Sequence, residues 1–196
     1  MKRRLSLLIV GLLLCAVALW ATTAGPGFPT TTSGNTGAGT VTWTSPGNIT
    51  ASDGIFATAA TNASTSQDLI GQGFGFSIPS GAVINGILLE ISAKSATGSD
   101  ANDLHVRLLK AGTPAGLDKG GLVTYSAANT VYSYGGSADL WGAAWAYTDL
   151  NSATFGGSLA VISGASDTAS VDFFRITVTY TYSGMMRRQI RYGGMP

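Results

Sequence analysis

Large apolar residues alternate with small or polar residues in the middle of the chain. Phe74, Phe76 and Ile78 follow this rule first. After the corner Pro79-Ser80-Gly81 the rule holds again, with one face formed by Val83, Asn85, Ile87, Leu89, Ile91 and Ala93. A period of two is typical of a β-strand with one buried face. The pattern therefore predicts two strands over residues 73–94, joined by a turn in which Pro fixes φ and Gly accepts a positive φ.

Two later stretches repeat the alternation. In residues 103–110 the rule places Leu104, Val106 and Leu108 inwards, and Asp103, His105 and Arg107 outwards. In residues 171–182 it places Phe174, Ile176, Val178, Tyr180 and Tyr182 inwards. If consecutive strands pair, Glu90 faces Arg107 or His105 on the outer surface of one sheet, a contact that contributes up to about 1 kcal/mol.

Shorter strands are expected at residues 40–44, 55–59, 122–125, 131–134 and 155–162, and one helical turn at 148–151. No stretch between residues 25 and 183 keeps a helical period. Eight to ten short strands with regular turn signals are typical of sandwiches and barrels. We therefore expect an all-β fold, an antiparallel two-sheet β-sandwich of jelly-roll type, with both of its ends in the same sheet.

The N-terminus has a different composition. Three basic residues precede an apolar run over residues 5–20, and small residues follow. This layout predicts a secretory signal peptide over residues 1–24, and an uncleaved membrane anchor is the alternative. Cys15, the only cysteine, lies within this run, so the rest of the chain has no thiol chemistry.

Composition divides the remainder into three parts. Residues 25–39 are rich in Gly and Thr and indicate a linker. Residues 40–183 hold the predicted sandwich, and residues 184–196 form a basic tail with three arginines and no acid. Between the two ends lie five basic residues and all ten acidic ones, so the body of the protein does not attract nucleic acid.

The order of several motifs resembles a known group of domains. The motifs are Gly75 to Ala82 with Ile84 to Ile87, Asp103 to Leu108, Asp139 to Gly142, Asn151 to Gly156, and Ala169 to Tyr180. Together they resemble a loose family of β-sandwich domains found in bacteriophage virion and tail-associated proteins and in exported bacterial proteins of unassigned function. The resemblance covers residues 40–182. It implies the fold and no catalytic residues.

Residues with catalytic potential are few. His105, the only histidine, is expected on an outer strand face, and the chain has no Gly-x-Ser-x-Gly motif around a nucleophile. Glu90, the only glutamate, lies within a strand beside basic residues, which is unsuited to a glycosidase acid. We therefore expect a protein that is not an enzyme and that holds no zinc.

Two groups of residues are candidates for binding. Asp100, Asn102 and Asp103 cluster in a turn and could hold a structural calcium ion, although Asp and Asn are also common turn formers. Tyr132, Tyr134, Trp141 and Trp145 either form a platform on which a sugar stacks or pack into the edge of the core.

These features predict an exported structural or adhesive subunit, secreted or at the cell surface, with a virion as the alternative location. Its partners would be other protein subunits, copies of itself, or cell-surface glycans. It would meet a membrane only through residues 5–20, if these are not cleaved. The alternative function is a carbohydrate-binding module that uses exposed Trp and Tyr residues. The two hypotheses differ in whether the rings of Tyr132, Tyr134, Trp141 and Trp145 are accessible.

Overall fold

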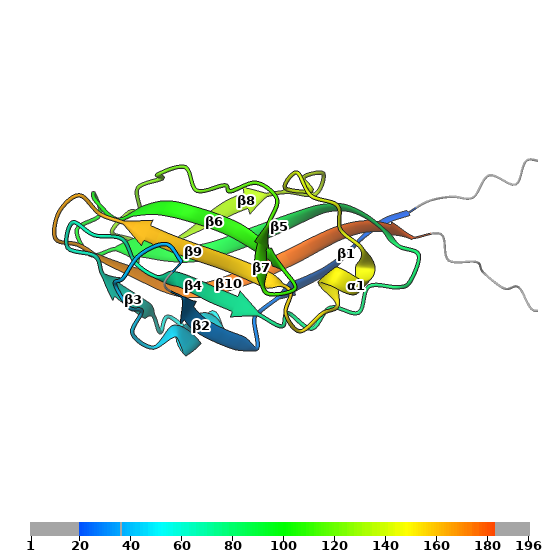
Figure 1. Cartoon of the computed structure of the whole chain (residues 1–196), viewed down its shortest axis with the longest axis horizontal. Helices are drawn as coiled ribbons and strands as arrows, with labels where there is room; N and C mark the ends of the chain where they lie inside the picture. The colour runs from blue at the N-terminus through cyan, green and yellow to red at the C-terminus, as the bar shows by residue number, and fades with distance from the viewer. Residues whose placement is uncertain (1–19, 36, 183–196) are drawn as a thin grey trace, which may run out of the picture.

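The computed structural model describes residues 20–35 and 37–182 (Figure 1). Most of the expected signal peptide and the whole basic tail lie outside these residues. Ten strands form two five-stranded sheets, so the predicted antiparallel two-sheet sandwich is confirmed. The first sheet has the order β1-β10-β5-β8, and β3 also pairs with β10. The second has the order β2-β4-β9-β6-β7.

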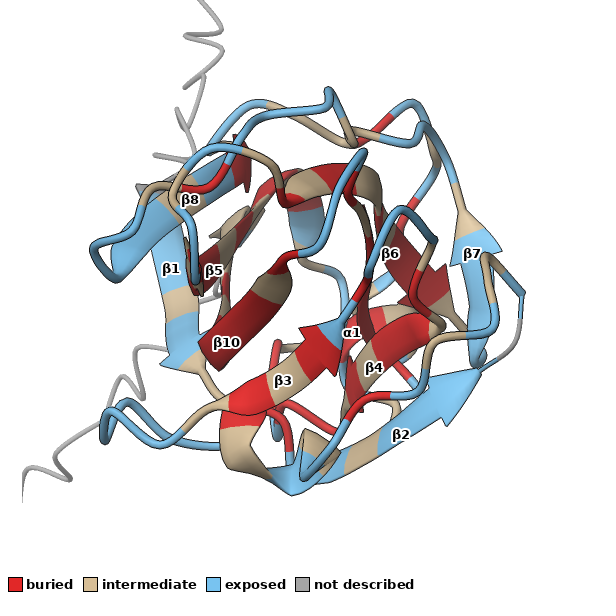
Figure 2. Cartoon of the chain, turned by 90° about the vertical axis from the view of Figure 1, so that its left-hand side faces the viewer, coloured by how far each residue is buried: buried red, intermediate tan, exposed pale blue. Residues whose placement is uncertain are grey.

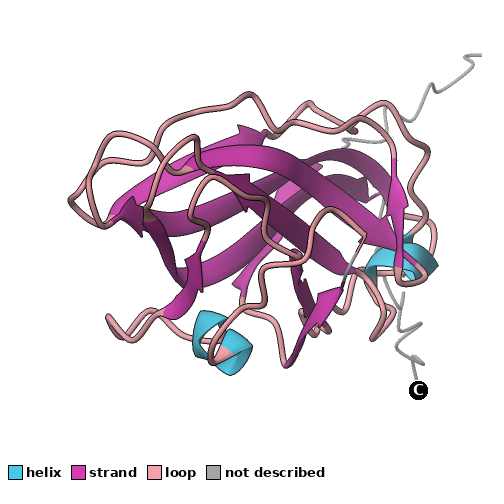
Figure 3. Cartoon of the chain, turned by 60° about the vertical axis from the view of Figure 1, so that its left-hand side comes forward, coloured by secondary structure: helices cyan, strands magenta, loops and turns pink. Residues whose placement is uncertain are grey.

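The strands of the first sheet are β1 (Trp20–Gly27), β3 (Ala57–Ala60), β5 (Val83–Ser95), β8 (Thr130–Gly135) and β10 (Thr168–Tyr182). Those of the second are β2 (Thr31–Asn35), β4 (Asp68–Gln72), β6 (Asn102–Lys110), β7 (Thr113–Ala115) and β9 (Gly156–Ile162). Figure 3 shows the two short helical segments beside the sheets. They are the 3₁₀ helix η1 (Pro46–Ile49) and the α-helix α1 (Tyr147–Leu150).

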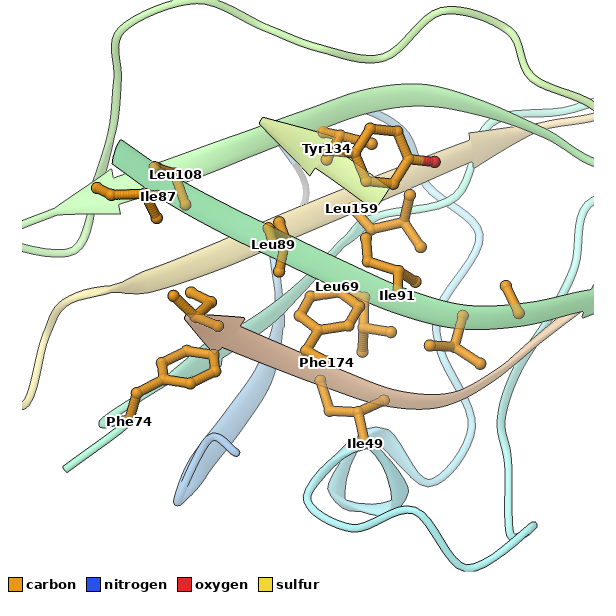
Figure 4. Packing of buried hydrophobic residues seen from close by; sticks show 14 of the residues in the cluster. Ile49, Leu69, Phe74, Ile87, Leu89, Ile91, Leu108, Tyr134, Leu159 and Phe174 are labelled. Carbon is orange, nitrogen blue, oxygen red and sulfur yellow. The ribbon is translucent and has the colours of Figure 1, made fainter. Parts of the chain in front are cut away.

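The pair β5–β10 forms the centre of the first sheet. Ile87 pairs with Val178, Leu89 with Ile176, and Ile91 with Phe174. All six side chains are fully buried, as the alternation predicts. Figure 4 shows Ile87, Leu89, Ile91 and Phe174 pointing between the sheets. Each such side chain contributes about 1.5–3 kcal/mol by leaving water, so this double row anchors the fold.

The second sheet covers that row from the other side. Leu69, Leu159 and Val106 lie side by side on β4, β9 and β6 and are fully buried. Buried residues dominate the strands at the centre of Figure 2, whereas β2, β7 and much of β1 are exposed at the edges.

The expected linker is wrong for most of its length. Residues 25–39 complete β1 and supply all of β2. β1 pairs with β10 from Trp20↔Tyr182 onwards, so both ends of the described chain lie in one sheet, as predicted. Residues 40–44 form isolated bridges instead of a strand.

A β-bulge changes which residues of β5 face inwards at its start. The register slips between Thr179 and Tyr180, so Gly86 pairs with Thr179 and Ile84 pairs with Tyr180. As a result Ile84 is buried, whereas Val83, which we expected to face inwards, is 64% exposed. A similar slip between Asp103 and His105 turns Asp103 into the core and leaves Leu104 partly exposed, the reverse of the prediction.

The expected contact of Glu90 with Arg107 or His105 is also wrong. β5 and β6 follow each other in the chain but belong to different sheets. Glu90 instead accepts two hydrogen bonds from Arg175 on β10, at 2.8 and 2.9 Å. His105 and Arg107 lie on the outer face of the other sheet.

Residues 73–78 join neither sheet, so the strand predicted there is absent, and Gly73 and Gly75 have positive φ values of 73° and 69°. Phe74, Phe76 and Ile78 are buried all the same, as the alternation predicts. Asn151 fixes this segment, since its amide side chain bonds to both the N–H and the C=O of Ile78. No helix within the described residues is long and apolar enough to cross a membrane.

Candidate binding site

The four aromatic residues predicted as a platform do not form one. Trp141 is fully buried, and its indole N–H donates to the backbone oxygen of Ile87 at 2.9 Å. Tyr134 is 7% and Trp145 is 9% exposed. Tyr132 is half-buried, and its ring centroid lies 4.8 Å from that of the buried Tyr125. Trp141 and Tyr134 therefore belong to the core, and only Trp145 reaches a surface hollow.

Two residues from different predictions meet inside the sandwich. Tyr134 on β8 donates its hydroxyl to the carboxylate of Asp103 on β6 at 2.8 Å, which joins the two sheets. Burial raises the pKa of Asp103, and the hydrogen bonds from Tyr134 and from the Val123 N–H partly oppose that rise. A buried carboxylate needs such donors, because leaving it without partners costs several kcal/mol.

The residues predicted to hold calcium have protein partners. Asp100 accepts the backbone N–H groups of Gly164 and Ala165. Asn102 donates to the backbone oxygen of Asp100 and accepts from the Thr124 hydroxyl. Asp103 faces the core. The described residues contain no group of three His, Cys, Asp or Glu side chains arranged to hold a metal ion.

His105 also lies in a defined setting. Its Nδ1 is 2.6 Å from a carboxylate oxygen of Asp118 and 2.7 Å from a guanidinium nitrogen of Arg107. The same Asp118 oxygen accepts from Arg107 Nε at 2.9 Å. Among the hydrogen bonds of the described residues, none links this histidine to a serine. We interpret the cluster as a surface ion pair between Arg107 and Asp118 that holds the loop after β7 against β6.

A hollow that is open to solvent lies at the end of the sandwich where β5 begins. It has a volume of about 470 Å³. Its lining residues come from the corner before β5 and from the segment that leads into α1: Gly81, Ala82, Val83, Ile84, Leu140, Ala144, Trp145, Ala146 and Tyr147. We call it the end pocket. Its lining is mainly apolar and its volume falls in the range of small-molecule sites, although the hollow is open rather than enclosed.

Two aromatic residues give the end pocket its wall. Trp145 is fixed on both sides, because its indole N–H donates to the Leu140 oxygen at 2.9 Å and its ring meets Phe155 edge-to-face at 5.6 Å. Tyr147, the first residue of α1, is half-buried, and no hydrogen bond of the described chain uses its hydroxyl.

Hydrogen bonds and an ion pair hold the segment that carries these rings. Asp149 accepts the N–H of Ala146 at 2.9 Å and so closes the first turn of α1. Its other partner is the Lys110 ammonium at 2.8 Å, which also bonds to the Ala144 oxygen. Burial opposes ionisation of Asp149, but the Lys110 and Ala146 bonds lower its pKa overall. The site is thus formed before any ligand arrives.

The sequence did not predict Leu140 and Val83 as members of this site, because Val83 lies far from the aromatic segment in the chain and neither residue belongs to a motif that indicates binding. Tyr147 is one of the further aromatic residues that the sequence offers for a sugar-stacking surface, beside the four named above. The one available signal was the pair of aromatic residues directly before a predicted helical turn.

The fold and the pocket together define an all-β sandwich with a preformed hollow at one end. No family model and no curated protein matches the sequence. Two solved structures are similar to it. The first, described as "CBM4 structure and function", is 16% identical over 62% of this chain and 82% of that chain, with a TM-score of 0.37. The second is the N-terminal cellulose-binding domain of β-1,4-glucanase C from Cellulomonas fimi, 14% identical over 78% of this chain and 89% of that chain, with a TM-score of 0.35.

Proposed function

We propose that this protein is a non-enzymatic carbohydrate-binding domain and that the end pocket is its binding site. The observation that carries the proposal is the placement of Trp145 and Tyr147 on the wall of a preformed hollow of about 470 Å³. The proposal keeps the carbohydrate-binding alternative that the sequence offers, with Tyr147 in place of Tyr132, Tyr134 and Trp141, which lie elsewhere.

The chemistry of the lining suits a sugar. One face of a pyranose ring exposes C–H groups and packs well on an aromatic surface, while its hydroxyls need hydrogen-bond partners. The pocket offers both, since the aromatic rings adjoin the Tyr147 hydroxyl and the exposed backbone at Gly81. No side chain in the lining is charged at neutral pH, which favours a neutral ligand.

Binding to a panel of neutral and acidic polysaccharides, measured by affinity electrophoresis and calorimetry, tests the proposal. We expect at least one neutral polysaccharide to bind. Tyr147→Ala should weaken that binding about tenfold or more, since an aromatic contact contributes about 0.5–1.5 kcal/mol beyond the area that it buries.

Phe56→Ala is the matched control. Phe56 is also half-buried, but it lies under the Lys94 ammonium near the opposite end of β5. The Phe56→Ala variant should bind carbohydrate as wild type does. Equal binding by wild type and Tyr147→Ala, or no binding to any polysaccharide, would contradict the proposal.

A second candidate, an adhesive subunit that acts through protein contacts, is supported by a different surface. Leu117, Leu122 and Val123, in the segment between β7 and β8, are 62%, 59% and 44% exposed. Exposed aliphatic groups of this kind are common at protein interfaces. If this surface joins copies of the chain, sedimentation should show concentration-dependent association, and Leu117→Glu should abolish it.

Either function requires access to an external surface, and we propose that the protein is exported. The intact mass of the protein purified from its native host tests this directly. A mass equal to that of the full chain would rule out a cleaved signal peptide.

A further inference from the structure

A second hollow lies on the outer face of the first sheet, beside β1. Its volume is about 400 Å³, and it is lined by Ala21, Thr22, Thr23, Ser137 and Thr179. We call it the threonine groove. Three of these residues, Ala21, Thr22 and Thr23, belong to the expected signal peptide over residues 1–24, so the groove is complete only in a chain that keeps them.

The sheet register explains how the hydroxyl groups come together. Thr23 on β1 pairs with Thr179 on β10, and Thr179 pairs with Gly86 on β5. All three therefore lie in one row across the sheet and face the same side. Gly86 has no side chain, and the segment after β8 lies over it: a Cβ there would come within 2.3 Å of the Gly136 oxygen. This contact brings Ser137 to the wall of the groove.

The groove presents hydroxyl groups that make no side-chain hydrogen bond within the described part of the chain. The neighbouring Thr181 differs, because its hydroxyl donates to the Asn85 amide oxygen at 3.3 Å. The hydroxyls of Thr23, Ser137 and Thr179 take part in none of the side-chain hydrogen bonds that the described residues make with one another. They are available to a ligand that supplies hydroxyl groups of its own.

The threonine groove adjoins the end pocket. Val83, which lines the end pocket, pairs with Thr181, and Thr181 pairs with Ala21, which lines the groove. The segment Ser137–Leu140 lies between the two hollows, since Ser137 lines the groove and Leu140 lines the pocket. This segment is held in place by the Asp139 oxygen, which accepts the N–H of Ile87 at 2.9 Å.

We propose that the threonine groove is a second subsite and that the two hollows together bind one neutral, chain-like oligosaccharide. The inference rests on the proposed function and extends it from a single sugar to a linear glycan. Neither lining contains a charged side chain, so an anionic glycan would lose water at both hollows without meeting a cation.

Calorimetric titration with β-1,4-linked glucose and mannose oligomers, from the monosaccharide to the hexasaccharide, tests the proposal. For wild type, affinity should rise with chain length until both hollows are occupied and then stay constant. The double variant Thr23→Val/Thr179→Val keeps the shape of both side chains and removes their hydroxyls. It should bind the longest oligomers roughly tenfold more weakly, because each lost hydrogen bond is worth about 0.5–1.5 kcal/mol.

The same variant should bind the shortest ligand as wild type does, because that ligand occupies the end pocket alone. Thr177→Val is the matched control, since Thr177 lies on β10 on the same face but outside the groove lining. It should leave affinity unchanged for every length.

The outcomes separate the two proposals. If Tyr147→Ala weakens binding but Thr23→Val/Thr179→Val binds long oligomers like wild type, the second subsite is wrong and the carbohydrate-binding function stands. If affinity does not change with length, or if polyuronates bind as well as neutral chains, the subsite proposal is also wrong. If none of the oligomers binds wild type, both proposals fail.

Discussion

Asp167 holds together the loops at the end of the sandwich far from the pocket. Its buried carboxylate accepts hydrogen bonds from the hydroxyls of Ser95 and Thr97, at 2.5 and 2.8 Å, and from the N–H groups of Thr97, Ala101 and Thr168. Burial alone would raise the pKa of Asp167, but these hydrogen bonds lower it from 3.8 to about 2. A lowered pKa in the folded state means that the ionised form stabilises the fold.

Because the pKa of Asp167 is lowered in the folded state, the free energy of unfolding should decrease as the pH falls. The unfolded chain takes up the Asp167 proton first as the pH falls, so the contribution is complete above about pH 5 and is lost between about pH 4 and pH 2. It amounts to about 2 kcal/mol. Chemical denaturation of wild type and Asp167→Asn at several pH values measures it. Their difference in unfolding free energy should be constant near neutrality and shrink in acid, and a difference that is the same at pH 3 and pH 7 would contradict the assignment.

Among the elements, the crossing of the 136–139 segment over β5 depends on one glycine. Gly86→Ala would place a Cβ 2.3–2.6 Å from backbone atoms of Gly136, Ser137 and Ala138. Overpacking of this kind usually costs about 1–3 kcal/mol, and displacement of the segment would disturb both hollows. We expect a lower thermal midpoint and weaker glycan binding. Gly136→Ala is the control, because nothing lies within 4 Å of the Cβ that it would add.

The pairing of β1 with β10 should contribute to the stability of the fold. Cleavage after Ala24, the site suggested by the sequence, would remove five of the six residues through which β1 pairs with β10. A variant that begins at Gly25 should therefore unfold at a lower temperature than one that begins at Trp20, by roughly 2–4 °C for each kcal/mol lost. Circular dichroism of the two variants decides the matter, and equal midpoints would show that β1 adds little.

Individual strands were predictable, but their neighbours were not. The alternation in Ile87, Leu89 and Ile91 identifies a buried strand face because side-chain direction is a local property of the strand. Partner choice depends on the whole chain, so Glu90 was assigned to Arg107 when its partner is Arg175, 85 residues away. Bulges have no reliable sequence signal either, and the one before His105 was enough to turn Asp103 inwards.

For the molecule as a whole, the path of the chain between the sheets determines how it unfolds. From β1 to β6 each strand lies in the sheet opposite to the one before it. Neither sheet can therefore form without the other, and nearly every strand pairing closes a long loop. We expect one cooperative transition, with far-UV and near-UV signals that coincide, and folding in the slow range of β-sandwiches, milliseconds to seconds. Two separate transitions would contradict this expectation.

Only one wall of the end pocket could be predicted from the sequence. The aromatic segment before α1 was recognised as a candidate, and Trp145 does line the end pocket. Its opposite wall comes from Val83 and Ile84, about sixty positions earlier, and those two residues exchange faces only because of the bulge at Asn85, next to them on β5. A hollow that forms between segments far apart in the chain cannot be predicted from a local sequence pattern.

The pairing of Trp20 with Tyr182 has a practical consequence for handling the protein. Both ends of the described chain emerge at the end of the sandwich that carries the end pocket (Figure 1). An affinity tag or a surface linker attached next to either strand would crowd the site that is to be assayed. The exposed turn at residues 51–55 lies elsewhere on the molecule, so a probe or a biotin attached there should leave the pocket open when the protein is immobilised.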